Sequence, residues 1–211
     1  MDEYKTDLLD LRRMDCMDLL RDTRDKAFEM AIVDPPYGIN VNMNMGRRAG
    51  MGTKHESKQW DNLSPDGEYF EQIFRVSKNQ IILGGNYFLL PQTRGFIIWD
   101  KMTPESLSFA MCEFAWSSFD CVSKIFRLPI QTDRQNRIHP TQKPVALYRW
   151  LLANYAKEGD RILDTHLGSM SSAIACHYAG YHLTGCELDA DYFTAGVERV
   201  KRETAQMTLT I

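Results

Sequence analysis

Long apolar runs are missing from this chain of 211 residues. Its apolar runs, such as Ile81–Leu83 and Gly95–Trp99, are far shorter than the roughly 20 residues that a membrane-spanning helix needs. The N-terminus begins with acidic and polar residues and lacks the charged-then-apolar layout of a secretory signal. We therefore expect a cytoplasmic protein.

Cysteine is scarce, and its spacing argues against two common ways of stabilising a fold. The five cysteines form neither a Cys-x-x-Cys pair nor a Cys/His ligand set, so we expect no disulfide framework and no metal. An odd number of cysteines also suits a reducing compartment. The chain has no Walker loop and no G-x-G-x-x-G fingerprint, which disfavours a P-loop enzyme and a dinucleotide-binding dehydrogenase.

No charge of one sign dominates, because the formal net charge is −3. Basic side chains nevertheless gather in two stretches, at residues 46–58 and 124–143. These stretches suit two solvated loops as well as a surface that contacts nucleic-acid phosphates. The candidate phosphate-binding residues are Arg47, Arg48, Lys54, Lys58, Arg134 and Arg137.

What the chain does contain is a regular alternation of strand-like and helix-like segments. Strands are expected at residues 29–34, 80–83, 95–101, 161–164 and 182–188, and helices at residues 65–77, 145–156, 171–179 and 191–203. This alternation predicts an α/β fold, with helices on both faces of a mostly parallel sheet that binds ligands at the carboxyl ends of its strands. Residues 40–60 lack a clear period and are expected to form a flexible loop.

The segment Asp34-Pro35-Pro36-Tyr37 follows a predicted buried strand and is the most informative part of the chain. A carboxylate oxygen beside a proline carbonyl provides two hydrogen-bond acceptors, which suits the two donors of an exocyclic amino group. Tyr37 offers a ring on which a planar base can stack. From composition alone, a plain Pro-Pro turn after a strand remains the alternative.

A second segment predicts a nucleoside-binding unit. The strand at residues 161–164 ends in Asp164, passes through a tight turn that contains Gly168, and enters a helix with serines at its start. The next strand ends at Glu187, where a carboxylate is expected to accept from ribose hydroxyls. An ordinary βαβ turn is the alternative. Met170 stands in this turn, and its Cβ makes a positive φ costly.

These two segments and the string His139-Pro-Thr-Gln-Lys-Pro144 resemble the motifs of the beta, circularly permuted, class of DNA amino-methyltransferases. The order also matches, because the catalytic motif comes first and the cofactor turn lies near the C-terminus. The resemblance implies a Rossmann-like class I methyltransferase fold with a seven-stranded sheet. It implies one catalytic domain over residues 1–211, with a small target-recognition insertion at residues 102–135. The departures from the family pattern are Met14, Thr165, His166 and Met170.

The resemblance also implies S-adenosyl-L-methionine as the cofactor and assigns roles to individual residues. The implied catalytic residues are Asp34, Pro35, Pro36 and Tyr37. The implied cofactor-binding residues are Asp15, Cys16, Asp34, Thr141, Lys143, Asp164, His166, Gly168, Ser169, Ser171, Glu187 and Leu188. Aspartate at the first motif position is commoner among adenine-N6 enzymes of the family. The implied activity is therefore site-specific methylation of adenine N6 in double-stranded DNA, by base flipping and direct methyl transfer.

Other functions remain open beside adenine methylation. Cytosine-N4 DNA methyltransferases and RNA methyltransferases use the same scaffold. A weakly active subunit that binds DNA or a partner would explain the departures at Met14 and Met170. The small recognition region suits either a short target sequence or a homodimer. The family context implies a prokaryotic or phage-encoded protein, of the kind found in restriction–modification systems.

Overall fold

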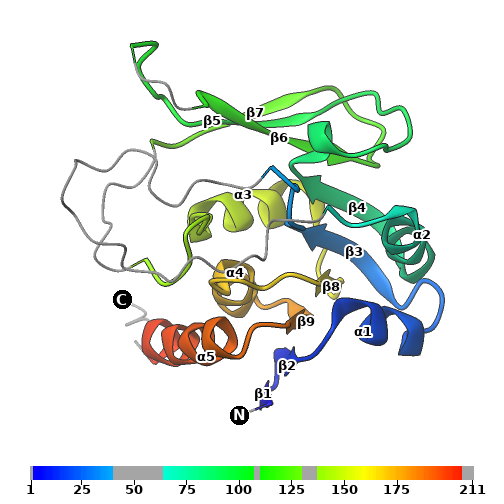
Figure 1. Ribbon diagram of the computed structural model, residues 1–211, viewed down its shortest axis with the longest axis vertical. Helices are drawn as coiled ribbons and strands as arrows, with labels where there is room; N and C mark the ends of the chain where they lie inside the picture. The colour runs from blue at the N-terminus through cyan, green and yellow to red at the C-terminus, as the bar shows by residue number, and fades with distance from the viewer. Residues whose placement is uncertain (1, 40–63, 107–109, 130–136, 206–211) are drawn as a thin grey trace.

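The computed structural model describes residues 2–39, 64–106, 110–129 and 137–205, which form one nine-stranded sheet with helices on both faces (Figure 1). The strands are β1 (Glu3–Lys5), β2 (Leu9–Arg13), β3 (Phe28–Val33), β4 (Ser77–Leu83), β5 (Ile97–Asp100), β6 (Cys112–Ser117), β7 (Lys124–Arg127), β8 (Arg161–Asp164) and β9 (His182–Glu187). The helices are α1 (Cys16–Asp22), α2 (Gly67–Val76), α3 (Val145–Tyr155), α4 (Ser171–Ala179) and α5 (Ala190–Thr204), with a 3-10 turn, η1, at Gly85–Tyr87. Every strand and helix predicted from the sequence is present.

The sheet runs in the order β1-β2-β9-β8-β3-β4-β6-β5-β7. Strands β2, β9, β8, β3 and β4 are parallel, and β6 runs antiparallel between β4 and β5. The mostly parallel sheet is thus confirmed, but the expected count of seven strands is wrong. The two edges are short strands, β1 and β7, whose residues alternate between exposed and half-buried. Neither edge strand has the apolar run that marks a buried strand in a sequence.

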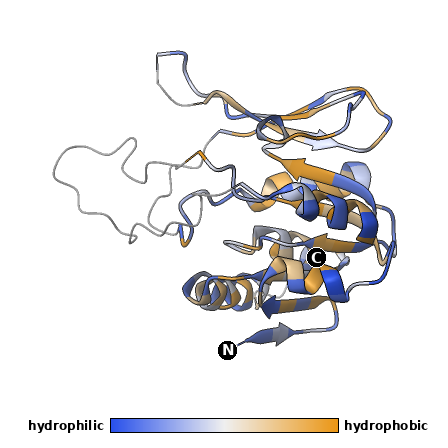
Figure 2. Cartoon of the chain, turned by 45° about the vertical axis from the view of Figure 1, so that its right-hand side comes forward, coloured by the Kyte–Doolittle hydropathy of each residue, from blue (hydrophilic) through white to orange (hydrophobic). Residues whose placement is uncertain are grey.

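Strand β3 lies between two hydrophobic cores, because successive side chains of a strand point to opposite faces. Met30 and Ile32 share a core with residues of α3, α4 and α5. Ala31 and Val33 share the other core with residues of α1 and α2. Figure 2 shows the central strands as mostly hydrophobic between the two helical layers. Burial on both faces explains why this strand reads as a continuous apolar run.

Three carboxylates meet at the edge where the parallel strands end. Asp34 directly follows β3, Asp164 is the last residue of β8, and Glu187 is the last residue of β9. These three strands are neighbours in the sheet. The edge at which ligand binding is expected therefore gathers the acidic residues that the sequence singled out.

Two segments with predicted roles need separate mention. Residues 102–135, the expected target-recognition insertion, contribute β6 and β7 to the sheet, so a recognition role would fall to the connections around these strands. That role stays a prediction. The expected flexible loop at residues 40–60 lies outside the described residues. Among the helices of the described ranges, none is long and apolar enough to cross a membrane.

Candidate active site

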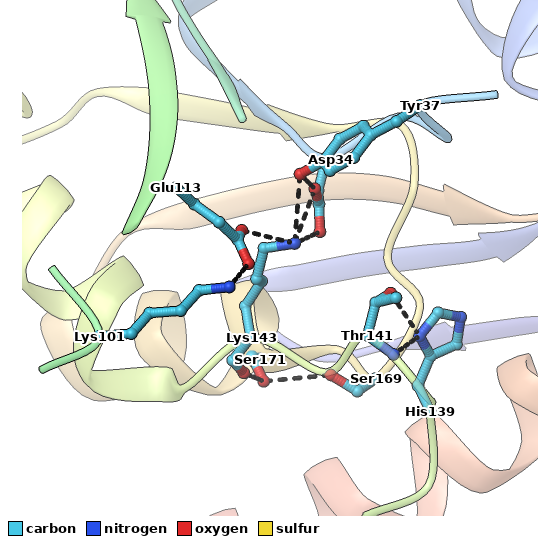
Figure 3. A network of polar contacts seen from close by, with 9 residues as sticks. All are labelled: Asp34, Tyr37, Lys101, Glu113, His139, Thr141, Lys143, Ser169 and Ser171. Carbon is cyan, nitrogen blue, oxygen red and sulfur yellow. Dashed lines mark hydrogen bonds and ion pairs between the residues drawn. The ribbon is translucent and has the colours of Figure 1, made fainter. Parts of the chain in front are cut away.

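Asp34 receives three hydrogen bonds at the end of β3 (Figure 3). Tyr37 Oη donates to its Oδ1 at 2.8 Å, and Lys143 Nζ donates to Oδ1 at 3.1 Å and to Oδ2 at 2.9 Å. Each carboxylate oxygen has two lone pairs. Within the described residues, Oδ1 is therefore fully used and Oδ2 keeps one acceptor position.

The ammonium group of Lys143 is enclosed by oxygen atoms. The side chain is only 6% exposed, and its Nζ lies 3.3 Å from Tyr37 Oη and 3.3 Å from Glu113 Oε2. Burial alone would lower the pKa of Lys143, but the carboxylates of Asp34 and Glu113 outweigh it and raise this pKa well above its usual value. Lys143 is thus a cation that contacts the catalytic motif, whereas the sequence assigned it to the cofactor. That cofactor role stays a prediction.

Two residues that the sequence did not single out extend this network. Glu113 lies on β6, and Lys101 directly follows β5. The Lys101 Nζ atom is 2.5 Å from Glu113 Oε1. Burial raises the pKa of Glu113, but the ammonium groups of Lys143 and Lys101 outweigh it, and the pKa is lowered. No signal in the sequence pointed to Glu113, because β6 itself was not predicted.

The ring of Tyr37 already has an aromatic neighbour. It stacks on Tyr87 of η1, with ring centroids 4.9 Å apart and ring planes 17° from parallel, and it meets Phe88 edge-on at 6.0 Å. Gly84 permits this packing, because its φ is +68° and a Cβ there would collide with the Tyr37 ring. A base that stacks on Tyr37 must therefore use the face opposite Tyr87 or displace Tyr87, which is 48% exposed.

Asp164 anchors the turn that follows β8. Its Oδ1 accepts from the backbone N–H of His166 at 3.0 Å, and its Oδ2 accepts from Ser172 Oγ at 2.5 Å. Burial raises the pKa of Asp164 to about 7, against the opposing effect of the Ser172 hydrogen bond. Asp164 thus holds the first and last parts of the turn together.

The raised pKa of Asp164 predicts a pH dependence of stability. The folded chain binds this proton more tightly than the unfolded chain does, so the contribution is fully present below about pH 4 and is lost as the pH rises through about 7. Asp164→Asn stays neutral and still offers an acceptor to His166. We expect its cost in unfolding free energy to be smaller at about pH 8 than at about pH 5. Urea unfolding at both pH values checks this, and a cost that grows with pH would contradict it.

Met170 adopts the left-handed conformation that its position in the turn demands. Its φ and ψ are 60° and 29°, and it precedes the first residue of α4. The side chain is fully buried over Gly196 of α5, where a Cβ would lie 2.8 Å from Met170 Cγ. The positive φ that the sequence suggested would be costly for Met170 is present. Burial of the Met170 side chain against Gly196 offsets this conformational cost.

Substitutions of Met170 separate these two effects. We expect Met170→Ala to lower the free energy of unfolding by about 2–5 kcal/mol, because it leaves a cavity beside Gly196. Met170→Gly leaves a similar cavity but relieves the left-handed backbone, which is worth about 1–2 kcal/mol. Chemical denaturation should therefore find the glycine variant the more stable of the two. The reverse order would show that backbone strain at residue 170 is negligible.

Glu187 and its neighbours fit one end of a nucleoside. Glu187 Oε2 accepts from the backbone N–H of Gly168 at 2.8 Å, and Oε1 accepts from that of Asp189 at 2.9 Å. Carboxylate oxygens have two lone pairs each, so both oxygens could also accept from a pair of ribose hydroxyls. The adjacent Leu188 is 65% exposed and offers an apolar surface beside these acceptors.

Asp15, Cys16 and His166 lie around the start of α1. The Asp15 carboxylate caps this helix by accepting from the N–H of Met17 at 2.7 Å. Cys16 Sγ is 3.9 Å from His166 Nε2, and Thr165 Oγ1 is 3.0 Å from His166 Nδ1. Burial lowers the pKa of His166 to about 4, so its ring is neutral near pH 7. The structure thus brings Cys16 into contact with His166, one of the turn residues that depart from the family pattern.

His139 and Thr141 lie on the other side of the turn. Thr141 Oγ1 is 3.2 Å from His139 Nδ1. The His139 ring packs against Tyr192 of α5, with centroids 4.4 Å apart, and a Cβ on Gly168 would lie 3.7 Å from it. The string at residues 139–144 therefore adjoins the Asp164 turn.

Arg199 is a further residue of this region that the sequence did not reveal. From α5, its Nη1 donates to the carbonyl of Ser169 at 2.8 Å and to Ser171 Oγ at 2.9 Å. Ser171 Oγ in turn donates to the carbonyl of Lys143 at 2.7 Å. Arg199 is 6% exposed. It therefore ties the turn to the backbone of the residue whose ammonium contacts Asp34.

Most of the candidate DNA contacts cannot be placed. Arg47, Arg48, Lys54, Lys58 and Arg134 lie outside the described residues, and Arg137 is half-buried. In the part of the chain that the structure describes, no group of three or more His, Cys, Asp or Glu side chains is placed to hold a metal ion.

Known proteins resemble this chain in sequence and in architecture. The family model described as "DNA methylase", of the N6/N4 type, matches residues 115–198. The Type II methyltransferase M.HpaI of Haemophilus parainfluenzae is 31% identical over 224 residues, which cover 87% of this chain and 71% of M.HpaI.

Two solved structures have the same fold at low sequence identity. The M1.HpyAVI-SAM complex aligns with a TM-score of 0.61 and 17% identity, over 92% of this chain and 99% of that one. The PvuII DNA methyltransferase, described as cytosine-N4-specific, aligns with a TM-score of 0.64 and 12% identity, over 99% of this chain and 89% of that one. Together with the extended match to M.HpaI, these findings establish that the chain belongs to the family of N6/N4 DNA methylases, which methylate amino groups.

Proposed function

We propose that this chain is an S-adenosyl-L-methionine-dependent DNA methyltransferase that methylates adenine N6 within a specific duplex sequence. The observation that carries the proposal is the position of Asp34. It lies at the sheet edge, keeps one acceptor position on Oδ2 within the described residues, and adjoins Pro35. An amino group with two hydrogens is the donor that this pair of acceptors suits.

The residues around the Asp164 turn support the choice of cofactor. Glu187 keeps lone pairs for ribose hydroxyls, and Leu188 presents an apolar side chain next to it. Asp15, Cys16 and His166 lie at the start of α1, and His139, Thr141 and Gly168 lie on the opposite side of the turn. When bound there, the cofactor supplies an electrophilic methyl group on a sulfonium. The similar protein M1.HpyAVI is known as a complex with SAM, which supports this proposal.

The catalytic motif would act by positioning the target amino group. The amino group of a paired base is inside the duplex, so the base must be flipped out to reach Asp34. Asp34 Oδ2 would accept one amino hydrogen and the Pro35 carbonyl the other. These bonds draw the nitrogen lone pair out of conjugation with the ring and point it toward the methyl group. The methyl–sulfur bond would break as the nitrogen–carbon bond forms, the sulfur would leave as a neutral thioether, and the nitrogen would release one proton to solvent. The main contribution of Asp34 and Pro35 would be the alignment of the reacting atoms.

The test is methyl transfer to nucleic acid followed by analysis of the product. Purified protein is incubated with tritiated S-adenosyl-L-methionine and genomic DNA from a methylation-free host, with RNA and bulk protein as parallel substrates. Digestion to nucleosides should give labelled N6-methyladenine, and single-molecule sequencing should locate it in one short sequence. Labelled N4-methylcytosine would show that the target base is cytosine and not adenine. Label only in RNA or protein would overturn the DNA assignment.

The contrasting possibility is a subunit that binds DNA or a partner without transferring methyl groups. Met14 and Met170, which depart from the family pattern, are the features that favour it. Titration calorimetry with S-adenosyl-L-methionine distinguishes the two, because an enzyme must bind this cofactor. Absence of cofactor binding together with DNA binding would favour the subunit.

A further inference from the structure

Four charged side chains with alternating sign form a row through the active site (Figure 3). Lys101 contacts Glu113, Glu113 faces Lys143, and Lys143 contacts Asp34. Their side chains are 12%, 24%, 6% and 15% exposed in that order. Buried charges are costly unless they are paired. The two positive and two negative charges cancel, which lowers the cost of burying the row. Of the four residues, only Asp34 belongs to the proposed catalytic motif.

Glu113 holds an oxygen that the present arrangement leaves unsatisfied. Its Oε2 is buried and has no hydrogen-bond partner among the described residues, although Lys143 Nζ lies 3.3 Å away. The reason is visible in the donors of Lys143. The hydrogen bonds of its ammonium group go to the two carboxylate oxygens of Asp34 and to Tyr37 Oη, whereas Glu113 Oε2 lies beside it at an ion-pair distance of 3.3 Å. Glu113 therefore faces a cation that is turned toward Asp34 and Tyr37.

This arrangement creates a competition at Asp34. Lys143 donates to both oxygens of Asp34, so an incoming amino group would have to share Oδ2 with the ammonium group. A second carboxylate within reach of the same ammonium lowers the cost of releasing Asp34, because the charge stays paired when the hydrogen bond moves. Lys143 stays protonated throughout, and only its donors are redistributed.

We propose that Lys143 is shared between Asp34 and Glu113, holding Asp34 while the site is empty and turning to Glu113 when the target amino group enters. Glu113 is then a positioning residue, which acts through Lys143 and does not touch the substrate. The inference rests on the proposed function for its substrate. The movement of the Lys143 hydrogen bonds from Asp34 to Glu113 can be tested on the protein without a substrate.

A crystal structure of Asp34→Asn without DNA tests the structural part directly. Neutralising Asp34 removes its hold on the ammonium, so Lys143 Nζ should move from its present ion-pair distance to about 2.8 Å from Glu113 Oε2, a charge-assisted hydrogen bond. Wild-type crystals grown under the same conditions are the reference. If Nζ keeps its wild-type position in the variant, Lys143 is not shared and the inference fails. This measurement needs no substrate, so it stands even if the protein methylates no DNA.

Kinetics of Glu113→Gln test the functional part. With no second carboxylate, Lys143 stays on Asp34, and kcat for DNA methylation should fall about 10- to 100-fold, as expected for a misplaced reacting group. The dissociation constant for S-adenosyl-L-methionine, measured by calorimetry, should stay unchanged. The ion pairs of Glu113 within the described residues are with Lys143 and Lys101, whereas the cofactor is proposed to bind mainly around the Asp164 turn. Lys101→Met is the matched variant, because it breaks the same ion pair with Glu113 but leaves that carboxylate to Lys143.

The comparison of the two variants separates positioning from simple structural support. If the ion pair of Glu113 and Lys101 only stabilises the sheet, both variants lose activity equally, and the inference is overturned. If Lys143 is shared, Glu113→Gln loses far more kcat than Lys101→Met does. Wild-type protein that labels no DNA in the same assay counts against the proposed function, and the Asp34→Asn crystal structure then decides the inference on its own.

Discussion

Asp34→Ala is expected to lower the rate of methyl transfer at least about 10²- to 10³-fold, the cost of removing one group aimed at the reacting atoms. Asp34 Oδ2 is the acceptor that would orient the target amino group, and no other carboxylate of the described site adjoins Pro35. The substitution also removes a partner of Lys143, which still has Glu113 as a counter-ion. The fold should therefore survive. Single-turnover methylation of duplex DNA measures the chemical step itself.

Two controls show whether the loss arises at the reacting atoms. Calorimetry should give nearly wild-type affinity of Asp34→Ala for S-adenosyl-L-methionine, because the residues proposed to bind it belong mainly to the Asp164 turn and its surroundings. Asp25→Ala removes an exposed carboxylate that pairs with Arg75 before β3, at the opposite end of that strand. Its activity should be close to that of the wild type. Wild-type turnover in Asp34→Ala would refute the role assigned to this residue.

Lys143→Met is expected to have the largest effect on stability. Removing one partner from a buried ion pair leaves uncompensated charge and costs about 3–5 kcal/mol. Here two carboxylates, Asp34 and Glu113, would lose their shared cation while only Lys101 remains beside them. The cost should be greater at about pH 8 than at about pH 5.5, because protonation of a carboxyl relieves the excess negative charge. Urea unfolding at both pH values gives the two free energies.

The matched surface substitution is Lys78→Met. Lys78 pairs with Glu29 at 3.2 Å and is 54% exposed, so its loss should cost at most about 1 kcal/mol. Adding Asp34→Asn to Lys143→Met should recover part of the lost stability, because Asp34 is the carboxylate left without a cation, whereas Glu113 keeps Lys101. If Lys143→Met were no worse than Lys78→Met, the charged row would contribute little to the fold.

The sequence was sufficient for the elements that build the parallel part of the sheet. The predicted bounds of β8 and α4 agree with the structure, because each combines a clean apolar pattern with clear stop signals. That Asp34, Asp164 and Glu187 lie at the edge where ligand binding was predicted follows from a topological rule, since neighbouring parallel strands end together. These predictions needed no knowledge of which side chains touch.

The parts that the sequence did not reveal depend on contacts between distant segments. Glu113 and Lys101 matter because β6 and β5 place them beside Lys143, and a local pattern contains no information about such a neighbour. For the same reason the sequence did not predict that the ammonium group of Lys143 donates to Asp34. Arg199 looked like an ordinary basic residue of a terminal helix. Its partners, the carbonyl of Ser169 and the hydroxyl of Ser171, become visible only in three dimensions.

The strand order has a consequence for how the chain folds during synthesis. Strand β2 is synthesised long before its parallel partner β9, since Leu9 pairs with Leu183. In the same way β3, which delivers Asp34, has β8 on one side and pairs Met30 with Ile162. Contacts of such long sequence separation form slowly, and their strand edges stay open until the partner arrives. The edges of β2 and β3 that face β9 and β8 therefore stay unpaired in the nascent chain until those two late strands have been synthesised.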